Sequence, residues 1–493
     1  MTIPFSRIPQ NLRVPLFYAE LDNSKANTAT TTTRSLIIGQ MLASGTATAN
    51  VPVLCSGKSA AQAAAGVGSM LALMVGAYRK NDSFGELWIL PLADAAAATK
   101  ATGTVTITSA ATDGGTIYLY IGGARIAQAV TSVQTTAQIA TALAATINAT
   151  DNMPVSAVAA ANVVTLTAIN AGTGGNEIDL RLNYLGAKSG EVLPTGLGIT
   201  VVTMAGGATA SDMTAALANL GDQKFEVIAC PYTDTASLDA MKALMNDSTG
   251  RWSWSRKIYG HVVAAYRGTL GNATTFGSGR NDQHVSVLPF YDSPTPAWLW
   301  AAELAGQAAV SVRADAAQPI REVALAGVLA PPPESRFQLT DRNVLLWDGM
   351  STFKVGDDGT VYIEKLVTTY QKNTLGSADN SYLDAETMFN LAYVLRQLET
   401  SATSNFSRVK LAADGTRFAP GSNIVTPSTI KASIIAKYQE LEFNGFVQDS
   451  TTFAKSIIVE KDANYSNRVN VLWPGILIDR LDIFALLAQF RLS

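Results

Sequence analysis

The chain has 493 residues, of which 15% are charged and 47% are hydrophobic, and its formal net charge is −3. Two cysteines and two histidines exclude a disulfide framework and an all-cysteine zinc site, and they leave little for a histidine-based metal centre. The near-neutral charge provides no overall basic field for nucleic acid, and the length predicts about three domains. So few charges on a long chain indicate that much surface is hidden, either inside the chain or against other chains.

Residues 59–78 form an uncharged stretch about as long as a membrane span. The stretch contains Gln62, two serines and three glycines, so it is more typical of a buried or interface helix than of a membrane segment. The first fifteen residues hold two arginines and three prolines, where a signal peptide would need an uninterrupted apolar core. We therefore expect a soluble protein made in the cytoplasm, without membrane insertion.

Residues 1–33 are predicted to form an N-terminal arm. Three prolines punctuate the segment, and proline suits extended or edge positions because it lacks an amide donor. One extended run follows them, which predicts a strand given to a neighbouring chain, with a frayed terminus as the alternative. The candidate strand-donating residues are Val14, Leu16, Phe17, Tyr18 and Leu21.

Residues 34–94 and 208–365 alternate apolar strands with helices, a pattern that predicts an α/β middle domain. The expected strands lie at 35–40, 86–90, 225–232, 259–266, 285–292 and 361–371. The expected helices lie at 67–79, 237–247 and 297–314, and another begins at Ser211.

Residues 95–207 interrupt this alternation with glycine-bounded runs that alternate apolar and polar residues. Charged residues fall to about 8% of this segment, against 15% in the whole chain. One helix is expected at 136–148, and Gly172 to Gly175 are interpreted as a hairpin connection. The segment therefore predicts an inserted, mostly antiparallel β domain.

Residues 366–493 are predicted to form a C-terminal α+β domain that ends in a second arm. A helix at 384–399 carries an apolar face of Met388, Leu391, Leu395 and Leu398, and a second helix starts at Thr426 before Pro427. Of three extended runs that follow, the last is too apolar to remain in solvent. Its candidate strand-donating residues are Leu481, Ile483, Phe484, Leu486, Leu487, Phe490 and Leu492.

Motifs that could carry chemistry are incomplete. Gly57-Lys58-Ser59 has Pro52 where a phosphate-binding loop needs glycine, so nucleotide binding is not expected. His284 has Asp282 nearby, but the sequence contains no nucleophile elbow for a hydrolase, and His261 is interpreted as a buried strand residue.

The remaining candidate clusters are explained at least as well by a structural role as by a binding or catalytic site. Cys55 and Cys230 lie among apolar residues and are expected to be buried, and Asp357-Asp358-Gly359 is interpreted as a turn. The basic and aromatic segment 251–257 suits an interface or the edge of a core better than a site for nucleic acid. We predict no catalytic residue, no cofactor and no metal, and hence a protein that is not an enzyme.

A long chain without site chemistry but with extended segments at both ends suggests a subunit of an assembly. An extended segment can add to a neighbour's exposed sheet edge, where main-chain hydrogen bonds provide affinity. If each chain donates head-to-tail, the contact is heterologous and produces rings or open helices.

Long stretches of the chain resemble the tail sheath proteins of Mu-like contractile-tailed bacteriophages. The matching stretches are GVGSMLALMVGAY, IPFSRIPQNLRVPLFYAELDNSKANT, YLDAETMFNLAYVLRQLETSATSNFSRVKLAADGTRF, IVTPSTIKASIIAKYQELEFNGFVQD and NRVNVLWPGILIDRLDIFALLAQFRL. The resemblance covers both ends and the α/β part, and it is weak over the inserted β domain.

The resemblance implies stacked six-membered rings around a rigid tail tube, which shorten and widen on a baseplate trigger and drive the tube through the host envelope. It implies that arms at 14–21 and 481–492 link neighbouring subunits, that the C-terminal domain faces the tube, and that the inserted domain lies outside. The implied partners are other copies of the chain, the tube protein, and baseplate and tail terminator proteins, in a virion tail assembled in the host cytoplasm.

Two alternatives stay open. The sheath of a phage-derived secretion or bacteriocin-like particle has the same architecture, and an enzyme of unrecognised type is the alternative from another class. The inserted β domain could also be a surface-binding module.

Overall fold

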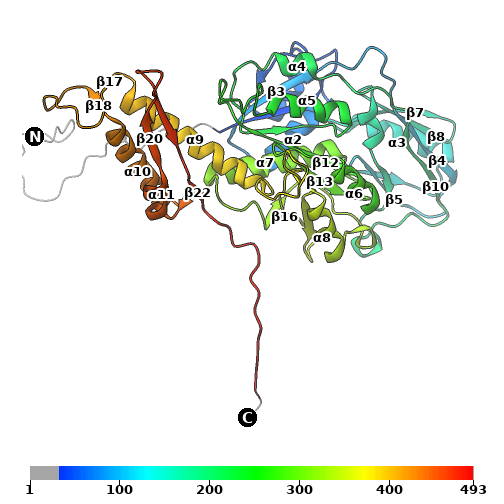
Figure 1. Cartoon of the computed structure of the whole chain (residues 1–493). Coiled ribbons are helices and arrows are strands. Elements are labelled where there is room, and N and C mark those ends of the chain that lie inside the picture. The colour runs from blue at the N-terminus through cyan, green and yellow to red at the C-terminus, as the bar shows by residue number, and fades with distance from the viewer. Residues whose placement is uncertain (1–32, 492–493) are drawn as a thin grey trace, which may run out of the picture.

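The computed structural model describes residues 33–491, and a six-stranded sheet forms its centre (Figure 1). The strand order is β13-β12-β11-β1-β3-β2, and all neighbours run parallel except the short edge strand β2. Parallel strands are buried on both faces, which explains their nearly continuous apolar sequences. The strands are β1 Arg34–Gln40, β2 Val53–Leu54, β3 Glu86–Leu92, β11 Val227–Ala229, β12 His261–Arg267 and β13 Val285–Phe290.

Helices pack around this sheet, and α7 is the most deeply buried of them, in contact with α2 and β12. The predicted bounds of α7 are confirmed at both ends. The helices of this region are α1 Lys58–Ala65, α2 Met70–Asn81, α4 Thr214–Ala218, α5 Thr235–Met245, α6 Leu270–Ser278 and α7 Ala297–Ala314.

Two predictions for these helices are wrong. Residues 59–78 form two helices, because Gly66 and Gly68 take positive φ values of 89° and 79° between them and the Ser69 hydroxyl then caps α2. The helix expected from Ser211 begins three residues later, at Thr214. Ser211 donates its hydroxyl to the carbonyl of Ala93 instead, and the Asp212 carboxylate accepts from the Thr214 amide.

Two antiparallel sheets and one helix lie between β3 and α4, as the alternation of the sequence predicts. The first has the order β10-β4-β8-β7, with β4 Thr102–Ser109, β7 Val155–Ala160, β8 Val163–Ala168 and β10 Gly198–Ala205. The second has the order β6-β5-β9, with β5 Gly115–Ile121, β6 Ala124–Val130 and β9 Leu180–Leu182. The helical segments are α3 Thr136–Ala149, η1 Thr173–Glu177 and η2 Ala187–Ser189.

The glycines at 172–175 do not form a hairpin. They enter the short helix η1, which leads from β8 in one sheet to β9 in the other, so the two strands are not paired with each other. The expected hairpin connection is therefore wrong.

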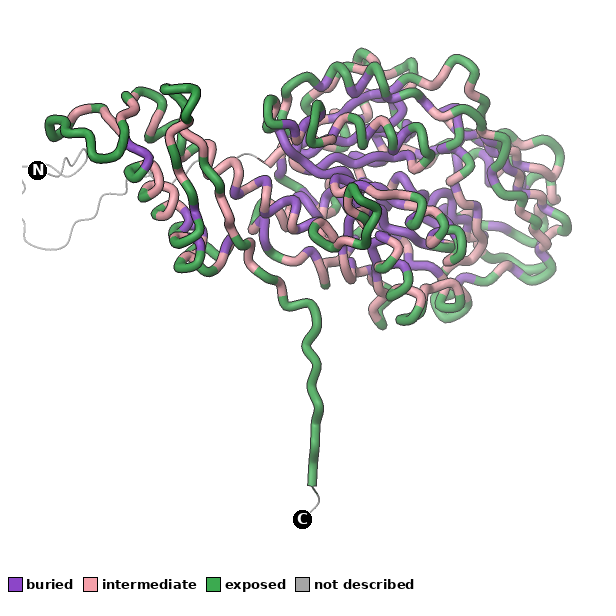
Figure 2. The backbone as a smooth tube through the Cα atoms, in the orientation of Figure 1, coloured by how far each residue is buried: buried purple, intermediate pink, exposed green. Residues whose placement is uncertain are grey.

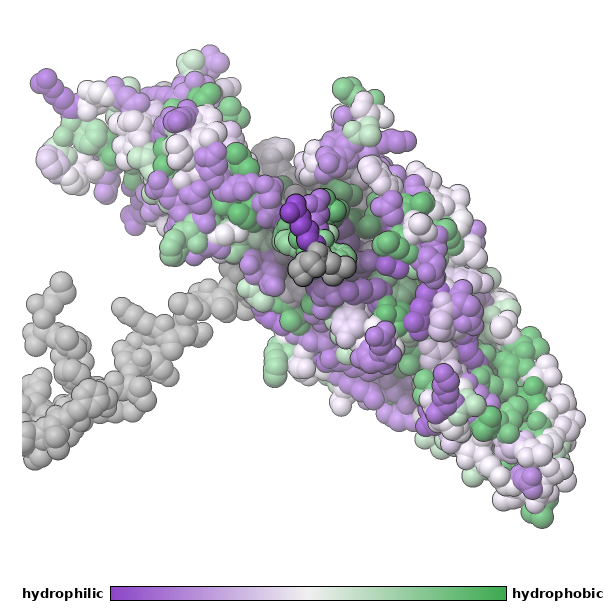
Figure 3. Space-filling model, turned by 90° about the horizontal axis from the view of Figure 1, so that it is seen from below, coloured by the Kyte–Doolittle hydropathy of each residue, from purple (hydrophilic) through white to green (hydrophobic). Residues whose placement is uncertain are grey.

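The low charge of this region corresponds to an uncharged face on the four-stranded sheet. Two rows of side chains cross that face: Val202, Thr104, Thr165, Val158; and Thr200, Thr106, Val163, Ala160. Neither row contains a charge, and the alternate residues Val105 and Val164 face the core. In Figure 3 the right-hand end of the molecule, where these sheets lie, is mostly white and green.

A small three-stranded sheet and a helix follow α7. The order is β14-β16-β15, with β14 Val323–Leu325, β15 Thr352–Val355 and β16 Val361–Lys365. The helical segments are η3 Pro333–Ser335 and α8 Leu339–Trp347. The predicted strand at 361–371 is shorter than expected and ends at Lys365. Residues 357–359 form the predicted turn, with Gly359 at φ 82°.

The last part of the chain forms a second, smaller core around Tyr438 and Phe453, whose rings stack with centroids 3.7 Å apart. Its helices are α9 Ala385–Phe406, α10 Pro427–Phe443 and α11 Ser450–Ser456. Its strands form three pairs, β17 Lys410–Leu411 with β18 Ile424–Val425, β19 Val447–Gln448 with β22 Ile476–Leu477, and β20 Ile458–Lys461 with β21 Val469–Leu472. The predicted α/β and α+β fold class is confirmed, whereas the domain boundaries stay a prediction.

Helix α9 belongs to both cores. Ala385 and Phe389 in its first turns pack into the large core, and Val394 packs into the small one. A helix of this length spans about 33 Å, so it works as a strut between the two bodies (Figure 1). Its predicted apolar face is only partly right, because Leu391 and Leu395 are half-buried while Ala385 and Phe389 are buried.

Two buried carboxylates tie α7 to α2. The Arg313 guanidinium donates to Asp82 at 2.6 and 3.1 Å, and the Tyr78 hydroxyl donates at 2.7 Å. Burial raises the pKa of Asp82, but these hydrogen bonds outweigh it and hold that pKa below its usual value. Glu303 accepts from Asn81 and from the Gly327 amide, and burial raises its pKa to about 7.

Replacing Arg313 with alanine should destabilise the subunit by about 3 kcal/mol, because it leaves the buried Asp82 carboxylate without its charged partner. Arg280→Ala is the matched control, since its partner Asp239 is 60% exposed and such a pair contributes at most about 1 kcal/mol. Urea unfolding of both variants measures the difference. Equal losses would contradict the assigned role of Arg313.

Glu303 makes stability depend on pH in a defined direction. Its pKa is about 7 in the folded chain, so between its usual value of 4.5 and 7 the unfolded chain releases a proton that the folded chain keeps. Stability therefore falls as pH rises through this window. Glu303→Gln removes the titrating group. The unfolding free energy of the variant minus that of the parent should therefore be roughly 2 kcal/mol larger at pH 8 than at pH 4.5. Urea unfolding at both pH values checks this, and an unchanged difference would contradict it.

Candidate assembly interface

The chain leaves the small core after β22 and continues to residue 491 without a helix or strand. Figure 1 shows this C-terminal segment running straight away from the body of the molecule. We call residues 483–491 the C-arm.

A cluster of ion pairs fixes the point where the C-arm begins. The Arg321 guanidinium donates to the Leu481 carbonyl at 2.6 Å and to the Asp482 carboxylate at 2.9 Å. Lys365 contacts the carboxylates of both Asp482 and Asp384, the latter at 3.1 Å. We call this cluster the arm-root clamp, and its members are Arg321, Lys365, Asp384, Arg480 and Asp482.

Charges in the clamp stabilise one another. Burial raises the pKa of Asp482, but Lys365 and Arg321 outweigh it and hold that pKa below its usual value. Burial lowers the pKa of Lys365, and the two aspartates outweigh it and keep that pKa above its usual value. Both shifts favour the charged forms of Asp482 and Lys365, and the ion pair between them holds the root of the arm in place.

Beyond the clamp the apolar side chains of the arm are exposed. Figure 2 shows the arm in the colour of exposed residues, in contrast to the buried strands of the body. In an extended chain, alternate side chains point to opposite sides, and here both sides are apolar. The exposed fractions are 71% for Leu481, 83% for Ile483, 79% for Phe484, 77% for Leu486, 83% for Leu487 and 84% for Phe490. Of the predicted C-terminal donors, Leu492 lies outside the described residues.

The small core offers a place where such a strand could add. β20 and β21 pair antiparallel from Ile458↔Leu472 to Lys461↔Val469, and within residues 33–491 neither strand has a second neighbour. Ile458 and Leu472 are 52% and 60% exposed. A two-stranded sheet is only marginally stable alone and its open edges are templates for pairing, so this hairpin is the candidate acceptor.

The five predicted N-terminal donors, Val14, Leu16, Phe17, Tyr18 and Leu21, lie outside the described residues. The structure does show where the N-terminal segment joins the body. The Arg34 amide donates to Glu226 at 2.7 Å, and its guanidinium pairs with Glu86 at 2.8 Å. The chain therefore enters β1, an interior strand of the central sheet, at a point held by a hydrogen bond and an ion pair.

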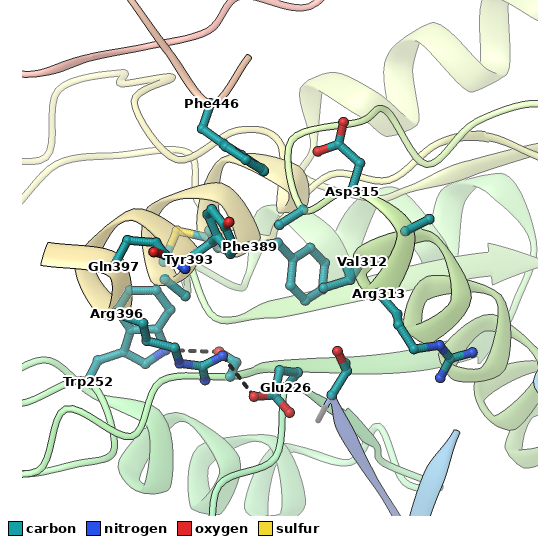
Figure 4. Close-up of a pocket in the computed structure, with 16 residues that line it drawn as sticks. Glu226, Trp252, Val312, Arg313, Asp315, Phe389, Tyr393, Arg396, Gln397 and Phe446 are labelled. Carbon is teal, nitrogen blue, oxygen red and sulfur yellow. Dashed lines mark hydrogen bonds and ion pairs between the residues drawn. The ribbon is translucent and has the colours of Figure 1, made fainter. Parts of the chain in front are cut away.

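Thr33 also lines a cavity of about 290 Å³ where α9 meets the large core (Figure 4). The Arg396 guanidinium crosses the cavity from α9, pairing with Glu226 at 2.8 Å and donating to the Ile258 carbonyl at 3.1 Å. Phe389 and Tyr393 of α9 form its apolar wall. Since both partners of the ion pair are engaged within the chain, we interpret the cavity as the joint between the two bodies.

The histidines are engaged in the core. His284 pairs with Asp247 at 2.9 Å, whereas Asp282 accepts from the backbone amide of His284. His261 is fully buried, as predicted, and contacts the Ser286 hydroxyl at 2.8 Å. Burial lowers the pKa of His261 to about 3, so it stays neutral. The buried Ser286 and His261 have no access for a substrate.

Other sequence candidates are also placed. Cys55 and Cys230 are buried, as predicted. The basic and aromatic segment 251–257 has both buried and exposed side chains: Arg251 is fully buried, whereas Trp254 is 85% exposed. Within residues 33–491 no group of three or more His, Cys, Asp or Glu residues could hold a metal ion. Over the same residues, no helix has both the length and the hydropathy needed to cross a membrane.

Sequence reasoning identified the C-arm but missed the clamp that holds it. Two of its three basic members come from distant positions, since Arg321 and Lys365 precede Asp482 by 161 and 117 residues. One local signal was available in the sequence. Arg480 and Asp482 lie immediately before the apolar run, and charged residues at that point indicate that the start of the arm is held by ion pairs.

Family models match two long segments of the chain. Residues 206–369 match the phage tail sheath protein central domain, and residues 377–491 match the phage tail sheath C-terminal domain. Together they cover more than half of the chain.

A relative matches along the whole length. The Mu-like prophage FluMu tail sheath protein of Haemophilus influenzae is 41% identical over 494 residues, which cover 100% of each chain. Among solved structures, the sheath tail protein from Desulfitobacterium hafniense is 14% identical with a TM-score of 0.47, covering 95% of this chain and 97% of that one. The contracted helical sheath of the anti-feeding prophage is 12% identical with a TM-score of 0.46, covering 97% and 99%. On its two domain matches and its full-length relative, the chain belongs to the phage tail sheath protein family.

Proposed function

We propose that this tail sheath subunit polymerises with its own copies as stacked six-membered rings around a tail tube, and that the polymer contracts to drive the tube through the host cell envelope. The observation that carries the proposal is the C-arm, an extended apolar segment that has no partner within residues 33–491 and a root fixed by five charged residues.

The C-arm would add to the open hairpin of β20 and β21 in a neighbouring subunit. Main-chain hydrogen bonds to the hairpin edge would satisfy the unpaired amides and carbonyls of the arm. Its two apolar faces would then both be covered, one by the acceptor's small core. Because donor and acceptor surfaces differ, the contact is heterologous and propagates into rings or helices.

The N-terminal run at residues 14–21 would be a second donated strand, a role that rests on the family resemblance. With two arms, each subunit is linked to more than one neighbour. The links could then persist while the bodies change their packing.

Contraction needs no bound nucleotide in this account. Since α9 enters both cores, the two bodies of a subunit would move together, and the change would occur at contacts between subunits. The uncharged sheet face at 102–205 would allow neighbours to re-pack with little desolvation of ions.

The remaining partners follow from the same account. The tube protein would contact the inner side of the polymer, and baseplate and tail terminator proteins would contact its ends. The subunit would be made and assembled in the host cytoplasm and would reside in the virion tail. Neither nucleic acid nor membrane insertion has a part in this function.

Deleting residues 483–493 should leave a soluble subunit that forms no tubes. The deletion ends beyond Asp482, so the arm-root clamp stays intact and the unfolding midpoint should not change. Sedimentation and negative-stain microscopy compare the truncated and full-length chains. Striated tubes of normal length from the truncated chain would contradict strand donation.

Asp482→Asn should raise the subunit concentration needed for tube growth by about tenfold, since the charge-assisted contacts that order the arm root weaken. Asp479→Asn is the matched control. It makes the same chemical change three residues earlier, at a side chain that accepts from Gln448 outside the clamp. Light scattering during polymerisation measures both, and identical thresholds would rule out a role for the clamp.

A further inference from the structure

An apolar groove of about 560 Å³ lies between the end of α8 and the segment that follows β16. Its size is within the range of about 300–1,000 Å³ typical of clefts that bury a ligand. Trp347 stands at its edge with 79% of its surface exposed, an unusual position for a tryptophan. We call it the α8 groove, and its apolar lining includes Leu346, Trp347, Val367, Tyr370 and Leu383.

The α8 groove adjoins the arm-root clamp. Lys365 lines the groove and also holds the Asp482 carboxylate. Leu383 lines the groove, and the next residue, Asp384, belongs to the clamp. The first residue of the C-arm, Ile483, therefore starts beside the wall of the groove.

Two segments could cover this groove, the chain's own C-arm and that of a neighbour. The clamp favours the chain's own arm, because a segment tethered at the mouth of a site has an effective concentration in the millimolar range for a short flexible link. A neighbour's arm would have to arrive by diffusion. In the proposed polymer it would also be engaged at the hairpin of β20 and β21.

In a free subunit, both the C-arm and the α8 groove expose apolar side chains to water. The arm exposes Ile483, Phe484 and Leu487, and the groove exposes Trp347. Exposed apolar patches of this kind promote aggregation unless they have a partner. Three extended residues reach about 10 Å from Asp482, enough to bring the arm over the groove.

We propose that in the unassembled subunit residues 483–487 fold back into the α8 groove, which stores the arm until a neighbour's hairpin takes it. The storage itself is independent of the sheath function. Only the transfer to a neighbour rests on the proposed function. Growth of the polymer would then require release of the arm from its own groove.

Cysteine cross-linking in dilute full-length subunits tests the storage. Ala485→Cys is combined with Asn380→Cys in the groove wall or, as the control pair, with Glu322→Cys, which follows Arg321 in the chain and does not line the groove. The native Cys55 and Cys230 are buried and should not compete. With a short bis-maleimide, the groove pair should form an intrachain product at least about tenfold faster than the control pair. Equal rates, or products only between chains, would overturn the proposal.

Trp347→Ala provides a second readout. Because this side chain is mostly exposed, its loss should not unfold the subunit. The intrachain cross-link of the groove pair should fall several-fold, and an unchanged rate would also overturn the proposal. The cross-link is measured without polymer, so failure to form tubes would count against the sheath function and leave the storage result standing.

Discussion

An extended chain that is apolar on both sides cannot remain stably in water, and this constraint governs the rest of the molecule. Its amides and carbonyls need partners, and its side chains need cover on two faces. The C-arm has neither within the part of the chain that the structure describes. In the proposed function, the cover that this segment needs in the polymer comes from a surface on a neighbouring subunit.

The body is built to present that segment rather than to bind a small molecule. Charged residues that could have served chemistry are used to join elements, as Arg313 joins α7 to α2 and Arg396 joins α9 to the central sheet. The histidines are buried and neutral or paired. Among the described residues, the arm, the open hairpin and the α8 groove are the surface features that we propose to contact polypeptide.

Helix α9 links the arm-root clamp and the small core to the large core. Because a single helix is shared by two cores, we expect a pull on the small core to reach the large one. The arm-root clamp lies near the start of α9, because Asp384 is its N-cap residue. Tension on a donated arm would therefore be carried into the strut.

The sequence was most informative where one local pattern decides the structure. The unbroken apolar run at 35–40 and the long helix at 297–314 were predictable because burial on both sides leaves no alternative. The stretch at 59–78 was interpreted as one helix because its apolar composition conceals two left-handed glycines at 66 and 68, whereas the helix expected at 67–79 corresponds to α2. The clamp was missed for a different reason. Two of its contacts join residues 161 and 117 positions apart, and a single sequence carries no record of such proximity.

The most direct test of the central claim is hydrogen exchange of the backbone amides of residues 483–491, compared between soluble subunits and assembled tubes. Strand donation predicts that the amides of residues 488–491, which lie beyond the segment stored in the α8 groove, exchange freely in the subunit. In the tube the amides of the whole arm become more protected than in the subunit, together with the outer-edge amides of β20 and β21. Tubes in which the arm amides exchange as fast as in the free subunit would contradict it.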